Sequence, residues 1–180
     1  MFATWGMFFA FAVHDAEEWV TMPGWGARNV DRLRHLYPRV PQRFWRRLDL
    51  PAVHVRVGIT VMGLVFLVAA ALGARTDGRA VVYQVVLIGF GVHGLGHLGQ
   101  ALLARGYTPG MITSVLVVLP FSIWAWRVVE DSGAVTANMG VLITVGVLLI
   151  TPVIVGVHLA VFAGRRLVGR VRQWQDPRHR

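Results

Sequence analysis

The sequence predicts an all-α fold, a polytopic membrane bundle of five transmembrane helices. Two observations lead to this fold class. The 180-residue chain is 55% hydrophobic with a mean hydropathy of +0.55, which is too apolar for an ordinary soluble domain. Its apolar residues also form runs of about 20 residues, the length that a helix needs to cross a bilayer. We expect one transmembrane domain over residues 1–164 and a basic cytoplasmic tail over 165–180.

The first span is predicted over residues 2–22. It lacks the basic start of a signal peptide, so we expect it to be retained. A Pro/Gly-rich break follows, and then a basic loop over 27–54 whose Arg residues alternate with aromatic and aliphatic ones. This composition is typical of a segment that lies on lipid headgroups.

Four further apolar runs follow that loop, separated by polar turns, and they predict spans at about 55–74, 80–104, 108–128 and 139–164. Thr108 and Pro109 are interpreted as the N-cap and first position of the fourth span. Pro120 is expected to kink that span.

The distribution of Arg predicts the orientation. Eight Arg in residues 27–56, Arg105 and six Arg in the tail fall on one side, fifteen in all, whereas three fall on the other. Because positive charge favours the cytoplasmic side, we expect the N-terminus outside and the C-terminus in the cytoplasm. The protein is expected to be a multi-pass protein of a bacterial inner or plasma membrane.

The composition also restricts the partners. A formal net charge of +9 would suit nucleic acid, but the Arg residues lie beside apolar runs, where anionic headgroups are the nearer partner. We therefore expect membrane lipids and no nucleic acid. The absence of Cys excludes disulfides, thiolate metal ligands and Cys nucleophiles.

The candidate functional residues begin inside the first span, where ionisable groups are costly and mark a functional site by default. His14, Glu17 and Glu18 are spaced i, i+3 and i+4, so they share one helical face. Asp15 points about 100° away from His14. Three proton-active or metal-binding groups therefore face one neighbour.

Histidines of two other spans lie at a matching depth. At about 1.5 Å of rise per residue, His93 and His97 lie about 20 and 26 Å below the outer end of their span, and His158 about 28 Å. His14 lies about 18 Å deep and the two glutamates about 22 to 24 Å. All six fall in the cytoplasmic half of the bilayer, so they can converge.

A metal site would use this set. Imidazoles and carboxylates are ordinary ligands of Zn or non-haem Fe, and HxxxH places two nitrogens for one ion. His93, His97 and either His14 or His158 would bind the metal, and Glu17 or Glu18 would complete the site. The remaining carboxylate would act as general base.

Two alternatives remain open. Without a metal, a buried Glu could protonate an olefin or epoxide and a His could take a proton back, with Trp5, Trp19 or Trp124 stabilising the cation. This architecture is loosely similar to small polytopic enzymes of isoprenoid and sterol metabolism. Alternatively, the His/Glu network only ties helices together or relays protons, and the protein is not an enzyme.

Two motifs resemble the HXXEE-domain family of small bacterial membrane proteins: the HxxEE pentad that starts at His14, and the region from His97 through Tyr107-Thr108-Pro109-Gly110 to Thr113. No activity defines that whole family. The resemblance covers most of the chain and implies one shared site composed of His14, Glu17, Glu18, His93 and His97.

The interpretation we favour is a metal-dependent membrane enzyme that hydrolyses or oxidises a lipid-like substrate. Its proposed catalytic residues are Glu17, Glu18 and His14, and its Zn or Fe ligands come from His14, Glu18, His93, His97 and His158. The runner-up is a cofactor-free terpene cyclase or isomerase. The third is a non-enzymatic bundle.

Overall fold

The structure is a computed structural model that describes residues 2–45, 51–146 and 148, and these residues contain helices and no strand. This confirms the all-α fold class. Residues 139–146 begin a further helical segment. The main elements are α1 (Phe2–Thr21), α2 (Trp25–Leu36), α3 (Gln42–Trp45), α4 (Ala52–Arg75), α5 (Val81–Ala104), α6 (Met111–Thr113), a π-helical turn (Ser114–Val118) and α7 (Leu119–Asp131).

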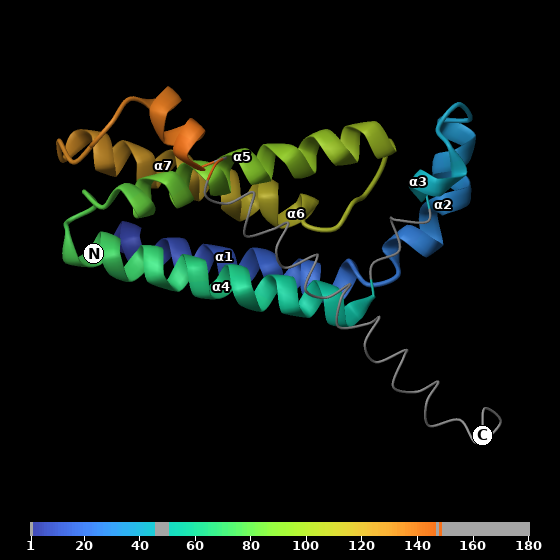
Figure 1. The fold of residues 1–180 in the computed structure, drawn as a ribbon, viewed down its shortest axis with the longest axis horizontal. Helices are drawn as coiled ribbons and strands as arrows, with labels where there is room; N and C mark the ends of the chain where they lie inside the picture. The colour runs from blue at the N-terminus through green and yellow to red at the C-terminus, as the bar shows by residue number, and fades with distance from the viewer. Residues whose placement is uncertain (1, 46–50, 147, 149–180) are drawn as a thin grey trace, which may run out of the picture.

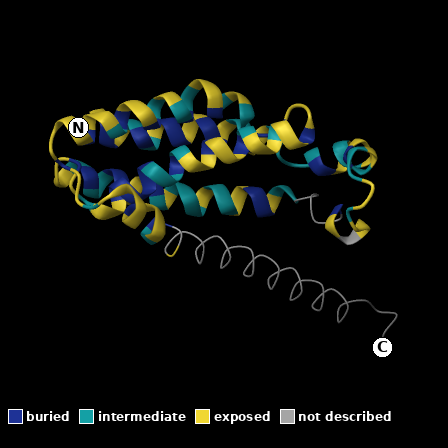
Figure 2. Cartoon of the chain, turned by 90° about the horizontal axis from the view of Figure 1, so that it is seen from above, coloured by how far each residue is buried: buried dark blue, intermediate teal, exposed yellow. Residues whose placement is uncertain are grey.

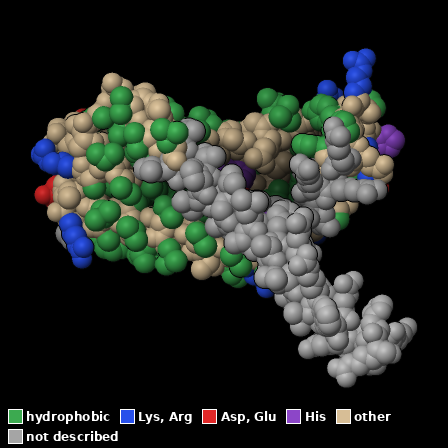
Figure 3. Space-filling view, in the orientation of Figure 1, with side chains coloured by type: hydrophobic (Ala, Val, Ile, Leu, Met, Phe, Trp, Pro, Cys, Tyr) green, Lys and Arg blue, Asp and Glu red, His purple; other side chains and the backbone are tan. Residues whose placement is uncertain are grey.

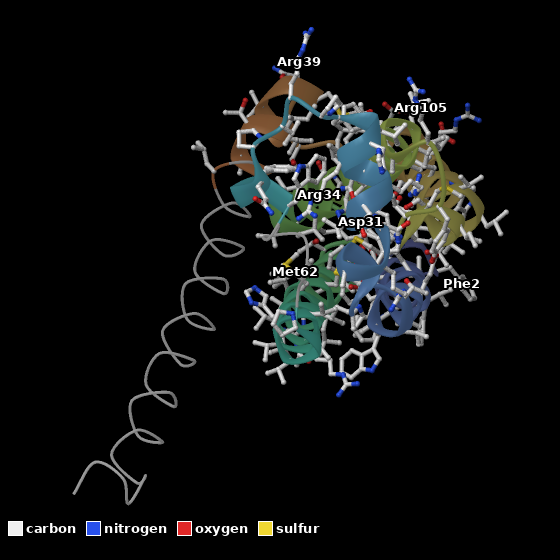
Figure 4. All side chains as sticks on the ribbon, turned by 90° about the vertical axis from the view of Figure 1, so that its right-hand side faces the viewer. Phe2, Asp31, Arg34, Arg39, Met62 and Arg105 are labelled. Atoms are coloured by element: carbon white, nitrogen blue, oxygen red, sulfur yellow. The ribbon has the colours of Figure 1, made fainter. Side chains whose placement is uncertain are left out.

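The long helices lie side by side and alternate in direction (Figure 1). α1 packs along α4, and α5 packs against α4 on one side and α7 on the other. The ends of α1 and α5 and the starts of α4 and α6 therefore meet at one end of the bundle. The short helices α2 and α3 lie beyond this end, where α2 crosses in front of the bundle (Figures 1 and 4).

Small residues let α4 and α5 approach closely in the core. Ala69 and Ala70 are fully buried, and a Cβ added at Gly73 would lie 2.6 Å from the ring of Tyr83. The Tyr83 hydroxyl in turn donates a hydrogen bond to the carbonyl oxygen of Ala3 in α1, at 3.2 Å. Buried positions accordingly follow the faces between helices, and exposed positions follow the outer faces (Figure 2).

The outer faces are apolar. Leu64 in α4 and Leu102 in α5 are 58% and 79% exposed, and the charged side chains in Figure 3 lie toward the ends of the bundle rather than over its middle. Within the described residues, three helices are long and apolar enough to cross a membrane: α4, α5 and the segment Met111–Asp131. Such outer faces indicate a membrane protein, because soluble monomers rarely expose apolar patches of this extent.

These three helices correspond to the spans predicted at 55–74, 80–104 and 108–128. α1 forms as predicted, but with Asp15, Glu17 and Glu18 in its 20 residues it is not among the three. Most of the span predicted at 139–164 and the tail at 165–180 lie outside the described residues. The count of five spans and the orientation therefore stay predictions.

Two local predictions were wrong. The fourth span begins at Met111 with Gly110 as its N-cap, not at Thr108 and Pro109, because the left-handed backbone of Gly110 (φ +79°) breaks the helix there. Pro120, where a kink was predicted, lies inside the continuous helical segment Met111–Asp131 and directly after its π-helical turn, so the irregularity of this span falls where the missing N–H of proline removes a helical hydrogen bond. The basic segment 27–54, predicted as a loop, contains α2 and α3.

A buried amide secures the opposite end of the bundle. Gln84, fully buried in the first turn of α5, donates to the carbonyl oxygens of Gly78 at 2.8 Å and Ala134 at 2.7 Å. Its Oε1 accepts from the backbone N–H of Thr136 at 3.1 Å and from the hydroxyl of Thr136 at 2.9 Å. One side chain thus ties together the connections before α5 and after α7.

Replacing Gln84 by Leu should destabilise the protein by about 2–4 kcal/mol, because buried backbone groups lose their partners. Thermal unfolding in detergent, followed by circular dichroism, measures the loss. Gln100→Leu is the matched control, since Gln100 is exposed on the same helix. Equal losses in the two variants would contradict the role of the amide.

Candidate metal centre

Two helices supply four side chains that converge at the α2 end of the bundle. His14 and Glu18 are one turn apart on α1, and His93 and His97 are one turn apart on α5. One ligand atom from each of the four side chains lies within 4.8 Å of all the others. His14, Glu18 and His97 are buried, whereas His93 is exposed. These four residues, here called the His/Glu cluster, could hold a metal ion.

The atoms of the cluster are spaced like the ligands of one ion. The Nε2 atom of His93 is 3.1 Å from Nε2 of His14 and 2.9 Å from Nε2 of His97. The Nε2 atom of His97 is 3.1 Å from Oε1 of Glu18. Two nitrogens at about 2.0–2.1 Å from a tetrahedral Zn²⁺ would be about 3.3 Å apart. Small outward shifts of the rings would therefore accommodate an ion.

The tautomer of His14 is set by Thr113. The Thr113 hydroxyl lies 2.6 Å from Oε2 of Glu17, to which it donates its only proton. It must then accept from Nδ1–H of His14, at 2.9 Å. A neutral His14 therefore carries its proton on Nδ1, and its Nε2 lone pair points at the other histidines.

Protons alone satisfy the His/Glu cluster poorly. If His14 is neutral, its Nε2 can only accept, so the Nε2–H of His93 must be shared between His14 and His97. Nε2 of His97 then accepts as well, so Glu18 must be protonated to donate to it. If His14 is instead doubly protonated, His97 must share one proton between His93 and Glu18. Either arrangement is strained in a buried site, whereas a single cation satisfies all four side chains at once.

Glu17 supports the His/Glu cluster from outside it. Its Oε2 accepts from the backbone N–H of Thr113 at 2.8 Å as well as from the hydroxyl. Its Oε1 accepts from the hydroxyl of Tyr107 at 2.8 Å. Burial and the bond to Glu17 raise the pKa of the Tyr107 phenol, so this donor keeps its proton at neutral pH. Glu17 thus fixes Thr113 at the end of α6 and, through Thr113, the ring of His14.

Gly110 lets the chain close over the His/Glu cluster. Its φ is +79°, and a Cβ there would lie 2.7 Å from Cε1 of His97 and 3.0 Å from Oε1 of Glu18. The turn excludes other groups from this side. Nδ1 of His97 is consequently buried without a hydrogen-bond partner among the described residues.

Asp15 lies apart from the His/Glu cluster, as its position on the helix predicts. It lines an apolar groove of about 330 Å³ between α1 and α4, together with Phe11, Trp19 and Leu64. The aromatic residues of the cyclase alternative also point elsewhere. Trp5, Trp19 and Trp124 are 36%, 39% and 47% exposed, and Trp19 packs under the guanidinium of Arg56 at 5.3 Å.

The structure thus brings together His14, Glu18, His93 and His97 of the predicted ligands and places Glu17 beside them. His158 lies outside the described residues. The predicted ligand set did not include Thr113, Tyr107 and Gly110, although all three fall within the motif region after His97. The available clue was their place in the chain. The connection between α5 and the fourth span starts one turn or two beyond His97, so it had to run close to the His/Glu cluster.

Comparison with known proteins gives one match. A family model described as "Protein of unknown function with HXXEE motif" matches residues 5–125, which include the whole His/Glu cluster together with Tyr107, Gly110 and Thr113. No curated protein and no solved structure matches the chain.

Replacing Gly110 by Ala should lower the melting temperature, because the new Cβ strains the backbone and collides with His97. The expected loss is about 2–4 kcal/mol, combining overpacking with left-handed strain. Gly133→Ala is the matched control, since Gly133 also has a positive φ of +66° but open space around its Cβ position. A loss no larger than that of the control would show that the close contact is unimportant.

Proposed function

Because this chain belongs to the family of proteins of unknown function with an HXXEE motif, its function has to be argued from the site, and we propose a membrane-embedded metalloenzyme. It acts on a lipid-like substrate by hydrolysis or oxidation. The observation that carries this proposal is the His/Glu cluster, in which three imidazole nitrogens and a carboxylate oxygen follow one another at 2.9–3.1 Å and all lie within 4.8 Å of one another. Mutual contacts of this kind are best satisfied by a cation.

The residues divide into two roles in this proposal. The side chains that hold the metal are His14, Glu18, His93 and His97. Glu17 and Thr113 position His14, as outer hydrogen bonds commonly do for metal-bound histidines. A divalent ion there would supply Lewis-acid or redox chemistry.

The surroundings of His93 support a lipid-like substrate. His93 is the exposed member of the His/Glu cluster, and Gly96, one turn away on the same face, has open space around its Cβ position. Within the described residues, the open side of the site therefore lies on a helix that is apolar enough to cross a membrane. An apolar molecule can reach such a site from the bilayer without crossing water.

A structural metal site is the second candidate. Four protein ligands close the coordination shell of Zn²⁺, as in structural zinc sites, whereas six-coordinate Fe would keep open positions. The four-ligand set favours this candidate, and the exposure of His93 favours the enzyme. Cobalt(II) in place of the native ion separates them, because added azide shifts the visible absorption only when a position is open.

The purified protein should contain about one equivalent of a transition metal, measured by elemental analysis after detergent purification without added metal. His97→Ala and Glu18→Gln should each lose most of it, because each removes a ligand. His35→Ala is the control, since His35 is exposed on α2, away from the His/Glu cluster. The proposal would be ruled out if folded wild-type protein contained no metal and also bound neither Zn²⁺ nor Fe²⁺ when these ions were added.

Thr113→Val should weaken metal binding by about 10- to 100-fold while leaving all four ligands in place, because His14 loses the partner of its Nδ1–H. Competition with a chelator of known affinity measures the change. Thr60→Val is the matched control, since the one partner of the Thr60 hydroxyl among the described residues is the carbonyl oxygen of Arg56 in its own helix. Unchanged affinity in Thr113→Val would mean that the Glu17–Thr113–His14 chain does not support the site.

A further inference from the structure

A polar pocket of about 530 Å³ lies beside the His/Glu cluster. It is formed where the end of α1, the helix α2 and the connection after α5 meet. The residues that carry its chemistry are Thr21, Trp25, Arg28, Asn29, Arg32 and Tyr107. No carboxylate of the described residues lines it. The pocket is therefore positively charged, and it faces the headgroup level if α4 and α5 span the bilayer.

Neither pocket arginine has an acidic partner in the part of the chain that the structure describes. The ion pairs among the described residues are Arg34 with Asp31 and His97 with Glu18. Arg28 and Arg32 lie one turn apart on α2, and both line the pocket. Two like charges at this spacing repel one another. An anion between them would relieve that repulsion.

Backbone groups hold both guanidinium groups in place. Arg28 donates to the carbonyl oxygens of Pro23 at 3.3 Å and Thr21 at 3.4 Å. Arg32 donates to the carbonyl oxygen of Ala104 and, at 3.0 Å, to Oδ1 of Asn29. Each group has five N–H donors, so each keeps unused donors for a ligand.

Two glycines make room for this arrangement. A Cβ at Gly24 would lie 3.0 Å from Nη1 of Arg28, and a Cβ at Gly106 would lie 3.4 Å from Nη1 of Arg32. The guanidinium groups thus rest against bare backbone on both sides of the pocket. Prior fixation of this kind lowers the entropy cost of binding an anion.

Tyr107 connects the pocket to the His/Glu cluster. Its carbonyl oxygen accepts from Nε1 of Trp25 at 3.2 Å, on the pocket side. Its hydroxyl donates to Glu17, which holds Thr113 and thereby His14. A molecule anchored in the pocket is therefore one residue away from the groups that orient the cluster.

We propose that this pocket binds a phosphate-type anion through Arg28 and Arg32. Arginine suits this role because its planar fork matches phosphate oxygens. If the anion is a lipid headgroup, the acyl chains attached to it would lie toward the apolar side of the bundle. The substrate class would then be a phosphorylated lipid. That last step rests on the proposed function, whereas the pocket itself does not.

Titration of the full-length protein in non-ionic detergent tests the proposal with three probes: dioctanoyl phosphatidic acid, dioctanoylglycerol and inorganic phosphate. We expect phosphatidic acid to bind at least tenfold more tightly than dioctanoylglycerol, which lacks the phosphate. R28Q/R32Q should weaken phosphatidic acid binding about tenfold. R28Q alone, which keeps the contact of Arg32 with Ala104, should weaken it about threefold. These fold-changes correspond to the loss of charge-assisted hydrogen bonds in an exposed site.

The matched control is R34Q, which removes the same charge from the same helix. Arg34 is paired with Asp31, lies beside it in Figure 4 and does not line the pocket. Tight binding of inorganic phosphate with the same dependence on Arg28 supports the pocket and identifies free phosphate as the ligand, whereas binding of the lipid alone identifies a headgroup. Equal affinity for the two lipids, no effect of R28Q/R32Q, or an equal effect of R34Q would overturn the proposal.

Metal content measured on the same samples keeps this test separate from the proposed function. Protein without metal that still binds phosphatidic acid through Arg28 and Arg32 retains the pocket and refutes the metalloenzyme. Protein with metal and no arginine-dependent binding retains the metal centre and refutes the pocket.

Discussion

The packing of α1 against α5 depends on the His/Glu cluster. Ionisable side chains inside a membrane bundle cost several kcal/mol unless they are paired. His14 and Glu18 find partners by facing His93 and His97, and His14 is also bonded to Thr113. Because each pair is spaced i, i+4, both helices must turn their polar faces toward each other, and this fixes their rotation. The connection to α6 lies against the same side chains, since Gly110 packs on His97 and Glu18 and Thr113 is hydrogen-bonded to His14.

Polar contacts thus secure the bundle at its two ends, and small apolar residues pack its middle. At one end is the His/Glu cluster with its Glu17 support, and at the other is Gln84 with its four hydrogen bonds. Between them, Ala69, Ala70 and Gly73 allow close helix contact. In lipid there is little hydrophobic drive for helices to associate, so buried hydrogen bonds and close packing must determine which faces meet.

The sequence predicted what depends on local pattern. Apolar runs identified α4 and α5 to within a few residues, and helical spacing placed His14 and Glu18 on one face and Asp15 on another. It did not predict what depends on the path of a connection. The turn at Gly110 displaced the predicted start of the fourth span, and α2 formed inside a segment predicted as a loop. The tertiary contacts of Tyr107 and Thr113 with Glu17 have no local signature, because their partner is more than 85 residues away.

The structure also gives a physical meaning to the two adjacent glutamates of the motif. Neighbouring residues on a helix point about 100° apart, so Glu17 and Glu18 cannot serve the same partners. Glu18, one turn after His14, completes the cluster at His97. Glu17, one residue earlier, reaches across to Thr113 and Tyr107. One carboxylate therefore contributes to the centre, and the other holds the chain that orients it. A single acidic residue at either position would leave one of these two tasks undone, which explains why both acids follow the histidine at these spacings.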